Sequence, residues 1–182
     1  MSNTGITDRG LRHLAGLPHL TDLRIGNIDP RHLLPGDPLP LNKITDAGLV
    51  HLKTLTKLQG LNLVGLPITD AGLDALKDLP NLGGLYLDRT RVSGPGLGRL
   101  KSLPSLAVLY LDGSALSDAG LSHLKGATNL QVLSLAGVPL SGLGLAHLKA
   151  LPKLDRLNIE GCGVTVEDHD AFLVARPSVK LE

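Results

Sequence analysis

The chain has 182 residues, enough for one domain with a sizeable core, and its 18 basic and 17 acidic residues leave a formal net charge of +1. This balance gives no reason to expect nucleic acid or an anionic membrane as a partner. One cysteine cannot form an internal disulfide, and neither a long apolar run nor a secretion signal is present, so we expect a cytoplasmic single domain over residues 1–182.

A short phrase recurs along the chain and divides it into repeats. The first copy begins at Ile6, and the next begins at Ile44, one period plus about 14 inserted residues later. The following copies keep a constant interval of 24 residues and begin at Ile68, Val92, Leu116, Leu140 and Val164. This regularity predicts a stack of similar coils that share one core.

Each copy has two halves with different periodicities. The first half, for example TDAGLVHLKTL after Ile44, spaces leucines by three and indicates one face of a helix. The second half, L-x-x-L-x-L, ends in the alternation typical of a short strand with one buried side. A hydroxyl residue suited to an N-cap opens the helical halves: Thr45, Thr69, Ser93, Ser117 and Ser141. An acidic residue follows in three copies, where the positive helix end favours a carboxylate: Asp46, Asp70 and Asp118.

Residues 29–43 interrupt the repeats with a proline-rich insertion, DPRHLLPGDPLPLNK. Its prolines exclude a regular helix or a central strand, and an insertion in a repeat stack forms a loop on one face. Two interpretations stay open, because the first repeat has no evident cap. Either the insertion covers the edge of the first repeat, or this edge docks on a second copy of the chain, on a missing domain or on a partner.

The last copy, residues 164–182, departs from the repeat and predicts a C-terminal cap. Phe172 and Val174 replace leucines of the earlier copies, and we expect a short closing strand around Val179. A terminal coil needs such a segment because its inner side would otherwise meet water.

The strand pattern and the phrase ITDAGL together resemble the leucine-rich repeats, in particular the short bacterial and cysteine-containing, F-box-associated types. The resemblance spans the chain from Ile6 to Val179, apart from the insertion. It implies an α/β fold: a right-handed solenoid, or horseshoe, with parallel strands on the concave face and helices on the convex face. It also implies a usual role in protein recognition. No F-box-like helical segment is present, so ubiquitin-ligase adaptor function is not implied.

The chemically reactive side chains form no catalytic or metal site by their pattern. Cys162 takes the position that the resemblance places inside the turn after a strand, and no histidine and carboxylate accompany it on that strand. Four histidines share one helical position, without a carboxylate or cysteine to complete a metal site: His13, His51, His123 and His147. We expect no catalytic residue, metal or cofactor.

A lysine recurs near the end of the helical half in five consecutive copies: Lys53, Lys77, Lys101, Lys125 and Lys149. This lysine stripe offsets the helix dipoles and keeps the convex face soluble. The alternative is that it binds an anionic surface such as phosphate, nucleic acid or lipid.

The residues beside the buried strand leucines point to the concave face, in columns that cross strands about 4.8 Å apart. Both tyrosines fall side by side in one column, and two aspartates stand in the next. Tyrosine is enriched in binding surfaces, whereas adjacent carboxylates cost stability unless a cation, from Arg89 or a partner, faces them. We predict a partner-binding site of eight residues: Tyr86, Tyr110, Asp88, Asp112 and Val108, with Arg24, Arg156 and Glu160 at its rims. The alternative is that the phrase LYLD was merely copied by duplication.

These observations favour a protein-binding scaffold over an enzyme. An enzyme would need a converging acid, base and nucleophile, and the repeat itself explains the residues that could serve. The recurrent glycines give no phosphate-cradling loop after a strand, because they lie within the helical halves: Gly48, Gly72, Gly96, Gly120 and Gly144. We therefore expect another protein as the partner, and neither nucleic acid nor membrane.

Overall fold

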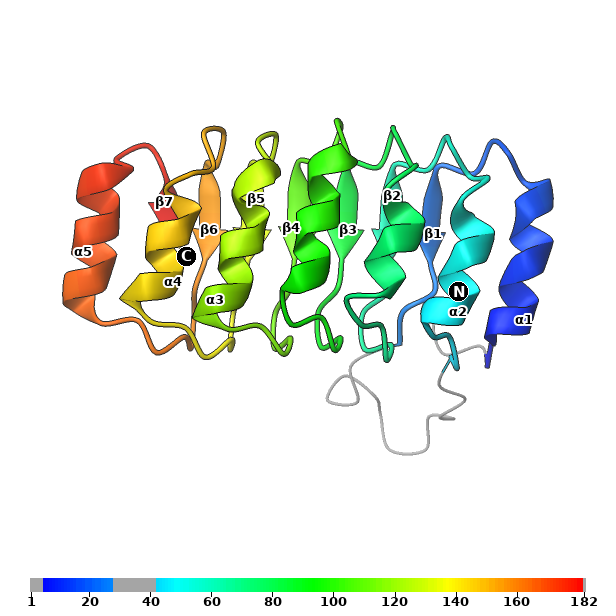
Figure 1. Ribbon diagram of the computed structural model, residues 1–182, viewed down its shortest axis with the longest axis horizontal. Helices are drawn as coiled ribbons and strands as arrows, with labels where there is room; N and C mark the ends of the chain where they lie inside the picture. Colours follow the sequence, from blue (N-terminus) through cyan, green and yellow to red (C-terminus); the bar gives the residue numbers. More distant parts are fainter. Residues whose placement is uncertain (1–4, 28–41, 182) are drawn as a thin grey trace.

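The computed structural model describes residues 5–27 and 42–181. Within these two ranges, seven parallel strands form one sheet in sequence order, and Figure 1 shows them side by side along the long axis with the helical segments in front. The strands are β1 (Asp22–Arg24), β2 (Gly60–Asn62), β3 (Gly84–Tyr86), β4 (Val108–Tyr110), β5 (Val132–Ser134), β6 (Arg156–Asn158) and β7 (Lys180–Leu181). This arrangement confirms the expected α/β solenoid of parallel strands on one face and helices on the other.

The helical segments are short, and many of them are 3₁₀ rather than α. They are α1 (Asp8–Leu11), η1 (Arg12–Gly16), α2 (Asp46–Leu49), η3 (Val50–Leu52), η4 (Gly72–Leu76), η5 (Pro95–Ser102), α3 (Asp118–Leu121), η6 (Ser122–Gly126), α4 (Gly142–Leu148) and α5 (Val166–Ala175). The leucine spacing of three accounts for this, because a 3₁₀ helix has three residues per turn and keeps Leu97 and Leu100 on one face. None of the helices in the two described ranges has the length and apolarity needed to cross a bilayer.

The core is a ladder of leucines between the sheet and the helices. Leu61, Leu85, Leu109 and Leu133 are register partners on neighbouring strands, and each side chain is 0% exposed. The single buried row expected from the repeats is therefore confirmed. Each buried leucine contributes about 1.5–3 kcal/mol to stability, and no coil could bury its leucines without its neighbours.

A second ladder joins the helix starts through the acidic residues of the ITDAGL phrase. The carboxylate of Asp46 accepts hydrogen bonds from Thr69 N–H and Thr69 Oγ1–H at 2.9 and 2.6 Å. Asp70 bonds Ser93 in the same way and also accepts from the backbone N–H of Gly94 and Gly96. Asp46 and Asp70 therefore each tie their own coil to the next, a contact between repeats that the sequence interpretation, confined to the helix dipole, did not include.

The glycine of the same phrase makes this close approach possible. A Cβ atom added to Gly96 would lie 2.6 Å from the carbonyl oxygen of Asp70 and 2.7 Å from its Cα. Added to Gly72, it would overlap the carboxylate of Asp46. Any larger residue would push neighbouring coils apart, so the glycines of the helical halves are packing residues.

The C-terminal coil is closed by α5, β7 and one arginine. Phe172 and Val179 are buried, at 1% and 4% exposed, whereas Val174 is 84% exposed and does not replace a core leucine as its position had suggested. The Arg176 guanidinium donates to backbone carbonyls of the preceding coil, those of Lys149, Leu151, Pro152 and Leu154. At this end of the stack, Arg176 therefore supplies hydrogen bonds to carbonyls of the coil before it.

The end of the proline-rich insertion is anchored, while residues 28–41, and with them most of the predicted 29–43 loop, lie outside the described residues. Asn42 is 3% exposed, and its side-chain amide donates to the Ile25 carbonyl at 2.7 Å. Its Oδ1 accepts from the Ile6 N–H at 3.1 Å. Asn42 thus links the first coil to the second through hydrogen bonds rather than apolar contact.

We predict that Asp70→Ala lowers the free energy of unfolding by about 1–2 kcal/mol, because it removes bonds to Ser93, Gly94 and Gly96. Burial opposes ionisation of Asp70, but these hydrogen bonds outweigh it and hold the pKa below 3.8. The loss should therefore persist above pH 3.8 and fade as the pH falls below that value. Denaturant titrations across pH measure it.

The matched control is Asp74→Ala, which removes only exposed ion pairs with Lys77 and Arg99. Such pairs contribute little, so this variant should lose less than about 0.5 kcal/mol. Equal losses from the two variants would show that the ladder does not hold the coils together.

Candidate functional site

The strand register builds the open side of the sheet, here called the sheet face, from columns of equivalent residues. The backbone pairing aligns one column of Arg24, Asn62, Tyr86, Tyr110, Ser134 and Asn158. The preceding column holds Asp22, Gly60, Gly84, Val108, Val132 and Arg156. The pairing therefore confirms the alignment that the 24-residue interval predicted.

Tyr86 and Tyr110 form a stacked pair at the middle of the sheet face. Their ring centroids lie 5.2 Å apart with an interplanar angle of 28°, and both side chains are half-buried. Offset stacking of this kind adds about 0.5–1.5 kcal/mol beyond burial and fixes both rings. The pair forms a rigid aromatic ridge across β3 and β4.

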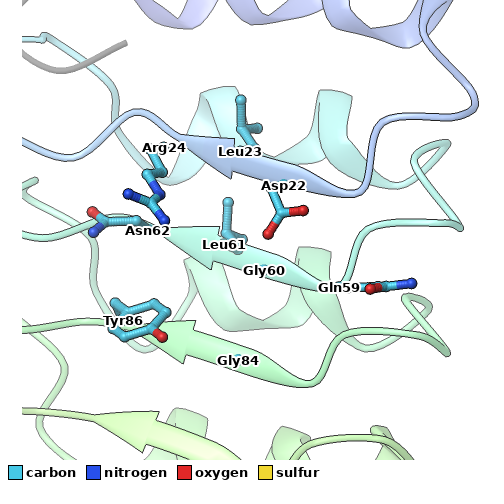
Figure 2. A pocket seen from close by; sticks show the side chains of 9 residues that line it. All are labelled: Asp22, Leu23, Arg24, Gln59, Gly60, Leu61, Asn62, Gly84 and Tyr86. Atoms are coloured by element: carbon cyan, nitrogen blue, oxygen red, sulfur yellow. The ribbon is translucent and has the colours of Figure 1, made fainter.

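A hollow of about 440 Å³, the Asp22–Tyr86 hollow, lies on the β1–β3 side of this ridge (Figure 2). Its floor is open because Gly60 and Gly84 have no side chain where the next two strands carry Val108 and Val132. The full lining consists of Asp22, Leu23, Arg24, Gln59, Gly60, Leu61, Asn62, Gly84 and Tyr86.

Two side chains lean over the glycine floor. The Asp22 carboxylate lies over Gly60, where an added Cβ would be 2.7 Å from its Oδ1. The Tyr86 ring folds back along its own strand over Gly84, where an added Cβ would lie 3.5 Å from the ring. The glycines therefore set the positions of the carboxylate and the phenol as well as the depth of the hollow.

Opposite charges stand at the two ends of the Asp22–Tyr86 hollow. Figure 2 shows Asp22 beside Gly60 and the Arg24 guanidinium beside Asn62. Both charged side chains are exposed, and neither has a hydrogen-bond or ion-pair partner within residues 5–27 and 42–181. The hollow thus offers a carboxylate, a guanidinium and an aromatic face that the described fold does not use.

The other side of the ridge has a smaller hollow of about 50 Å³. Tyr110, Val132, Ser134, Arg156 and Asn158 contribute to its lining. Valine fills the position that glycine leaves open beside Tyr86, which explains why this hollow is shallow. Arg24 and Arg156 consequently lie on opposite sides of the tyrosine pair.

Asp88 and Asp112 bind the neighbouring strand rather than projecting freely. Asp88 Oδ1 accepts from the Asp112 N–H at 2.9 Å, and Asp112 Oδ1 accepts from Ser134 Oγ–H and the Ala136 N–H at 2.6 and 2.8 Å. Burial raises the pKa of Asp88 from 3.8 to about 6; the bond from Asp112 N–H opposes this shift, and the Asp112 carboxylate adds to it. The two aspartates therefore have a structural role in addition to any role in binding.

The eight predicted site residues fall into separate parts of the sheet face. Arg24 and Tyr86 line the Asp22–Tyr86 hollow, Tyr110 and Arg156 line the small hollow, and Val108 stands beside Gly84. Asp112 and Glu160 line a third, open hollow of about 610 Å³ at the turns that follow the strands. Sequence reasoning missed Asp22, Gln59 and Asn62, although glycine at two successive column positions signals an open floor.

Cys162 shares a hollow with polar side chains of the C-terminal helix. His169 and Asp170 of α5 line one hollow of about 480 Å³ with it, although the expectation concerned only the strand that carries the cysteine. The Cys162 thiol nevertheless donates to the Leu135 carbonyl, with sulfur and oxygen 3.2 Å apart, and burial raises the pKa of the thiol. His169 Nδ1 contacts Asp170 Oδ1 at 3.1 Å. A protonated thiol bonded to backbone is a poor nucleophile.

Within the described ranges, no three histidine, cysteine, aspartate or glutamate side chains are grouped so as to hold a metal ion. His123 and His147 are exposed at equivalent positions of adjacent coils. Among the described residues, the sheet face presents a stacked tyrosine pair, several hollows and the charged side chains of Asp22 and Arg24.

Parallel strands that alternate with short helical segments around a leucine ladder define the leucine-rich-repeat fold, and the chain has this fold throughout its described coils. No family model matches the chain, and no curated protein matches it in sequence.

The solved structures that share the fold include the following two. Internalin C2 of Listeria monocytogenes superimposes with a TM-score of 0.70 and 29% sequence identity, over 98% of this chain and 66% of the internalin. A leucine-rich-repeat protein of Leptospira interrogans gives a TM-score of 0.63 at 18% identity, over 93% of this chain and 38% of the other. The chain thus spans just under two thirds of the first protein and less than half of the second.

We predict that Asp88→Asn stabilises the protein at pH 7–8 by about 1 kcal/mol, because it removes a half-buried charge and keeps an oxygen that accepts the Asp112 N–H. The raised pKa means that the folded protein binds this proton more tightly than the unfolded chain. Wild-type stability should therefore fall as pH rises from about 4 to 6, and the advantage of Asp88→Asn should vanish below pH 3.8.

Denaturant titrations of both proteins at several pH values measure this difference. Asp88→Ala is the matched control, since it removes the charge and also leaves the Asp112 N–H without its acceptor, so it should gain less. A pH-independent difference between wild type and Asp88→Asn would contradict the assignment.

Proposed function

We propose that this chain is a recognition module that binds another protein through its sheet face. The observation that carries the proposal is the stacked Tyr86–Tyr110 ridge beside the Asp22–Tyr86 hollow, whose two charged ends have no partner among the described residues. Rigid tyrosines lose little side-chain entropy on binding and are enriched among residues that dominate interface energies.

Several features of the chain favour a scaffold rather than an enzyme. The thiol of Cys162 is protonated and bonded to a carbonyl, and the paired aspartates are bonded to neighbouring strands. The residues on either side of each buried strand leucine lie on the open face of the sheet, so packing of the core does not restrict their type. Of the two structural neighbours, the Leptospira protein is named as a leucine-rich-repeat protein and the Listeria protein as an internalin.

We also propose a repeat type, a cellular compartment and a class of partner for this chain. The constant interval of 24 residues and the cysteine after β6 favour the short bacterial or cysteine-containing type of repeat. The single cysteine favours a reducing compartment such as the cytoplasm. Neither nucleic acid nor membrane is the expected partner, because the net charge is only +1.

The lysine stripe supports a second candidate function, binding of an anionic surface. All five lysines are exposed on the helical side, in one position of consecutive coils: Lys53, Lys77, Lys101, Lys125 and Lys149. One of them, Lys77, lies 3.4 Å from the Asp74 carboxylate, and local acids of this kind reduce the attraction for phosphate. We therefore rank this function second.

The sheet-face proposal predicts that Tyr86→Ala/Tyr110→Ala keeps the circular dichroism of the wild type and weakens partner capture at least tenfold, because it removes the aromatic ridge. Wild type and variant are used as matched baits in quantitative affinity capture. The affinity of each differentially captured, purified protein is then measured by calorimetry.

A third bait, with Lys77, Lys101 and Lys125 changed to glutamine, tests the lysine stripe on the opposite side. Partners that the tyrosine variant loses and this bait retains support the sheet face. Partners lost only by the lysine bait, with affinity that falls steeply with salt, would overturn the proposal in favour of anion binding.

A further inference from the structure

The structure assigns the Asp22–Tyr86 hollow a specific ligand chemistry: we propose that it receives an arginine side chain of the protein partner. This inference rests on the proposed function, which it makes more definite by naming the residue type that is recognised. It depends on three groups of the hollow, the Asp22 carboxylate, the Tyr86 ring and the Arg24 guanidinium.

The Asp22 carboxylate supplies the charge that selects a cation. Its oxygen lies over Gly60, inside the hollow, and no described residue donates a hydrogen bond to it. A carboxylate with no donor among the described residues suits the paired, charge-assisted hydrogen bonds that carboxylates form with a guanidinium. Asp88 and Asp112 differ from it, because each already accepts backbone bonds from a neighbouring strand.

The Tyr86 ring favours a planar cation over a compact one. Tyr110 stacks against one side of the ring, and Tyr86 forms part of the wall of the hollow. A guanidinium stacks on such a ring and keeps its in-plane N–H groups free for a carboxylate. A lysine ammonium can satisfy the carboxylate but cannot stack as a plane, so we expect arginine to bind more tightly than lysine.

Arg24 lies at the other end of the hollow. Because of its positive charge, the hollow is not a purely anionic site that would bind any cation. In Figure 2 its guanidinium lies beside Asn62, toward the carboxyl ends of β1 and β2, whereas Asp22 lies over Gly60. The strand separates the two Cα atoms by about 6.6 Å, two residues of extended chain. An incoming arginine therefore points toward Asp22 while backbone carbonyls of the same partner segment meet Arg24 and the Asn62 amide.

The size and polarity of the hollow agree with this occupant. Its volume of about 440 Å³ lies in the range of clefts that hold small ligands, about 300–1,000 Å³. A purely apolar side chain would leave Asp22 and Arg24 desolvated without partners. A partner carboxylate at the Asp22 end would meet repulsion.

The test is a titration of the isotope-labelled full chain with a blocked tripeptide that has arginine at its centre, followed by NMR. We expect saturable shifts of the Gly60 and Gly84 amide signals, since these residues form the floor. The matching peptide with citrulline, which keeps the shape and loses the charge, should bind about tenfold more weakly. The lysine peptide should fall between them.

Three variants locate the contact. Asp22→Asn should weaken the arginine peptide about tenfold, and Gly60→Val should abolish its binding by filling the floor with the residue that β4 and β5 carry. Gly60 does not have a positive φ, so valine suits its backbone. Asp155→Asn is the matched control, an exposed acid outside the hollow, and should bind like the wild type.

The outcomes separate this inference from the proposed function. Equal binding of the arginine and citrulline peptides, shifts that cluster away from Gly60 and Gly84, no binding at all, or full affinity in Asp22→Asn would each overturn the arginine assignment. None of these results alters the capture experiment with the tyrosine variant. If capture survives loss of both tyrosines, the sheet-face proposal fails even where the peptide binds.

Discussion

The stacking of each coil on the next is the interaction on which the molecule depends. Leucines such as Leu85 and Leu109 are fully buried only because the neighbouring coil covers them. Where a copy carries the aspartate, as at Asp70, its carboxylate bonds the hydroxyl residue of the next copy, and a glycine such as Gly96 lets the two backbones approach. The spacing of the leucines, the polarity of the aspartate and the small size of the glycine therefore all support the packing of one coil on the next.

This packing divides the residues of the chain into constrained and unconstrained positions. The core and the helix starts accept few residue types, whereas the two outward positions of each strand accept many, because their side chains lie outside the contact. The differences between repeats consequently distinguish one part of the sheet face from another. Glycine at 60 and 84 opens a hollow that valine at 108 and 132 reduces, and the tyrosines occur only on β3 and β4.

Acidic residues show the same division. The carboxylates of Asp70 and Asp112 accept hydrogen bonds from the neighbouring coil. Burial raises the pKa of the half-buried Asp88 to about 6. Asp22 stands at the edge of the sheet, on the first strand, and has no such bond among the described residues. Our proposal therefore assigns the recognition of a partner's charge to Asp22 and not to the bonded aspartates.

The sequence by itself determined the repeat interval, the leucine row, the parallel order of strands and the adjacency of Tyr86 with Tyr110, because a constant period fixes which residues become neighbours. Only the tertiary structure decided where the side chains of these neighbouring residues point and what they contact. The position of the Tyr86 ring over Gly84, that of Asp22 over Gly60 and the hollow shared by Cys162 and His169 depend on rotamers and on packing between coils. Periodicity assigns a residue to a column, but the space left by its neighbours sets where its side chain points.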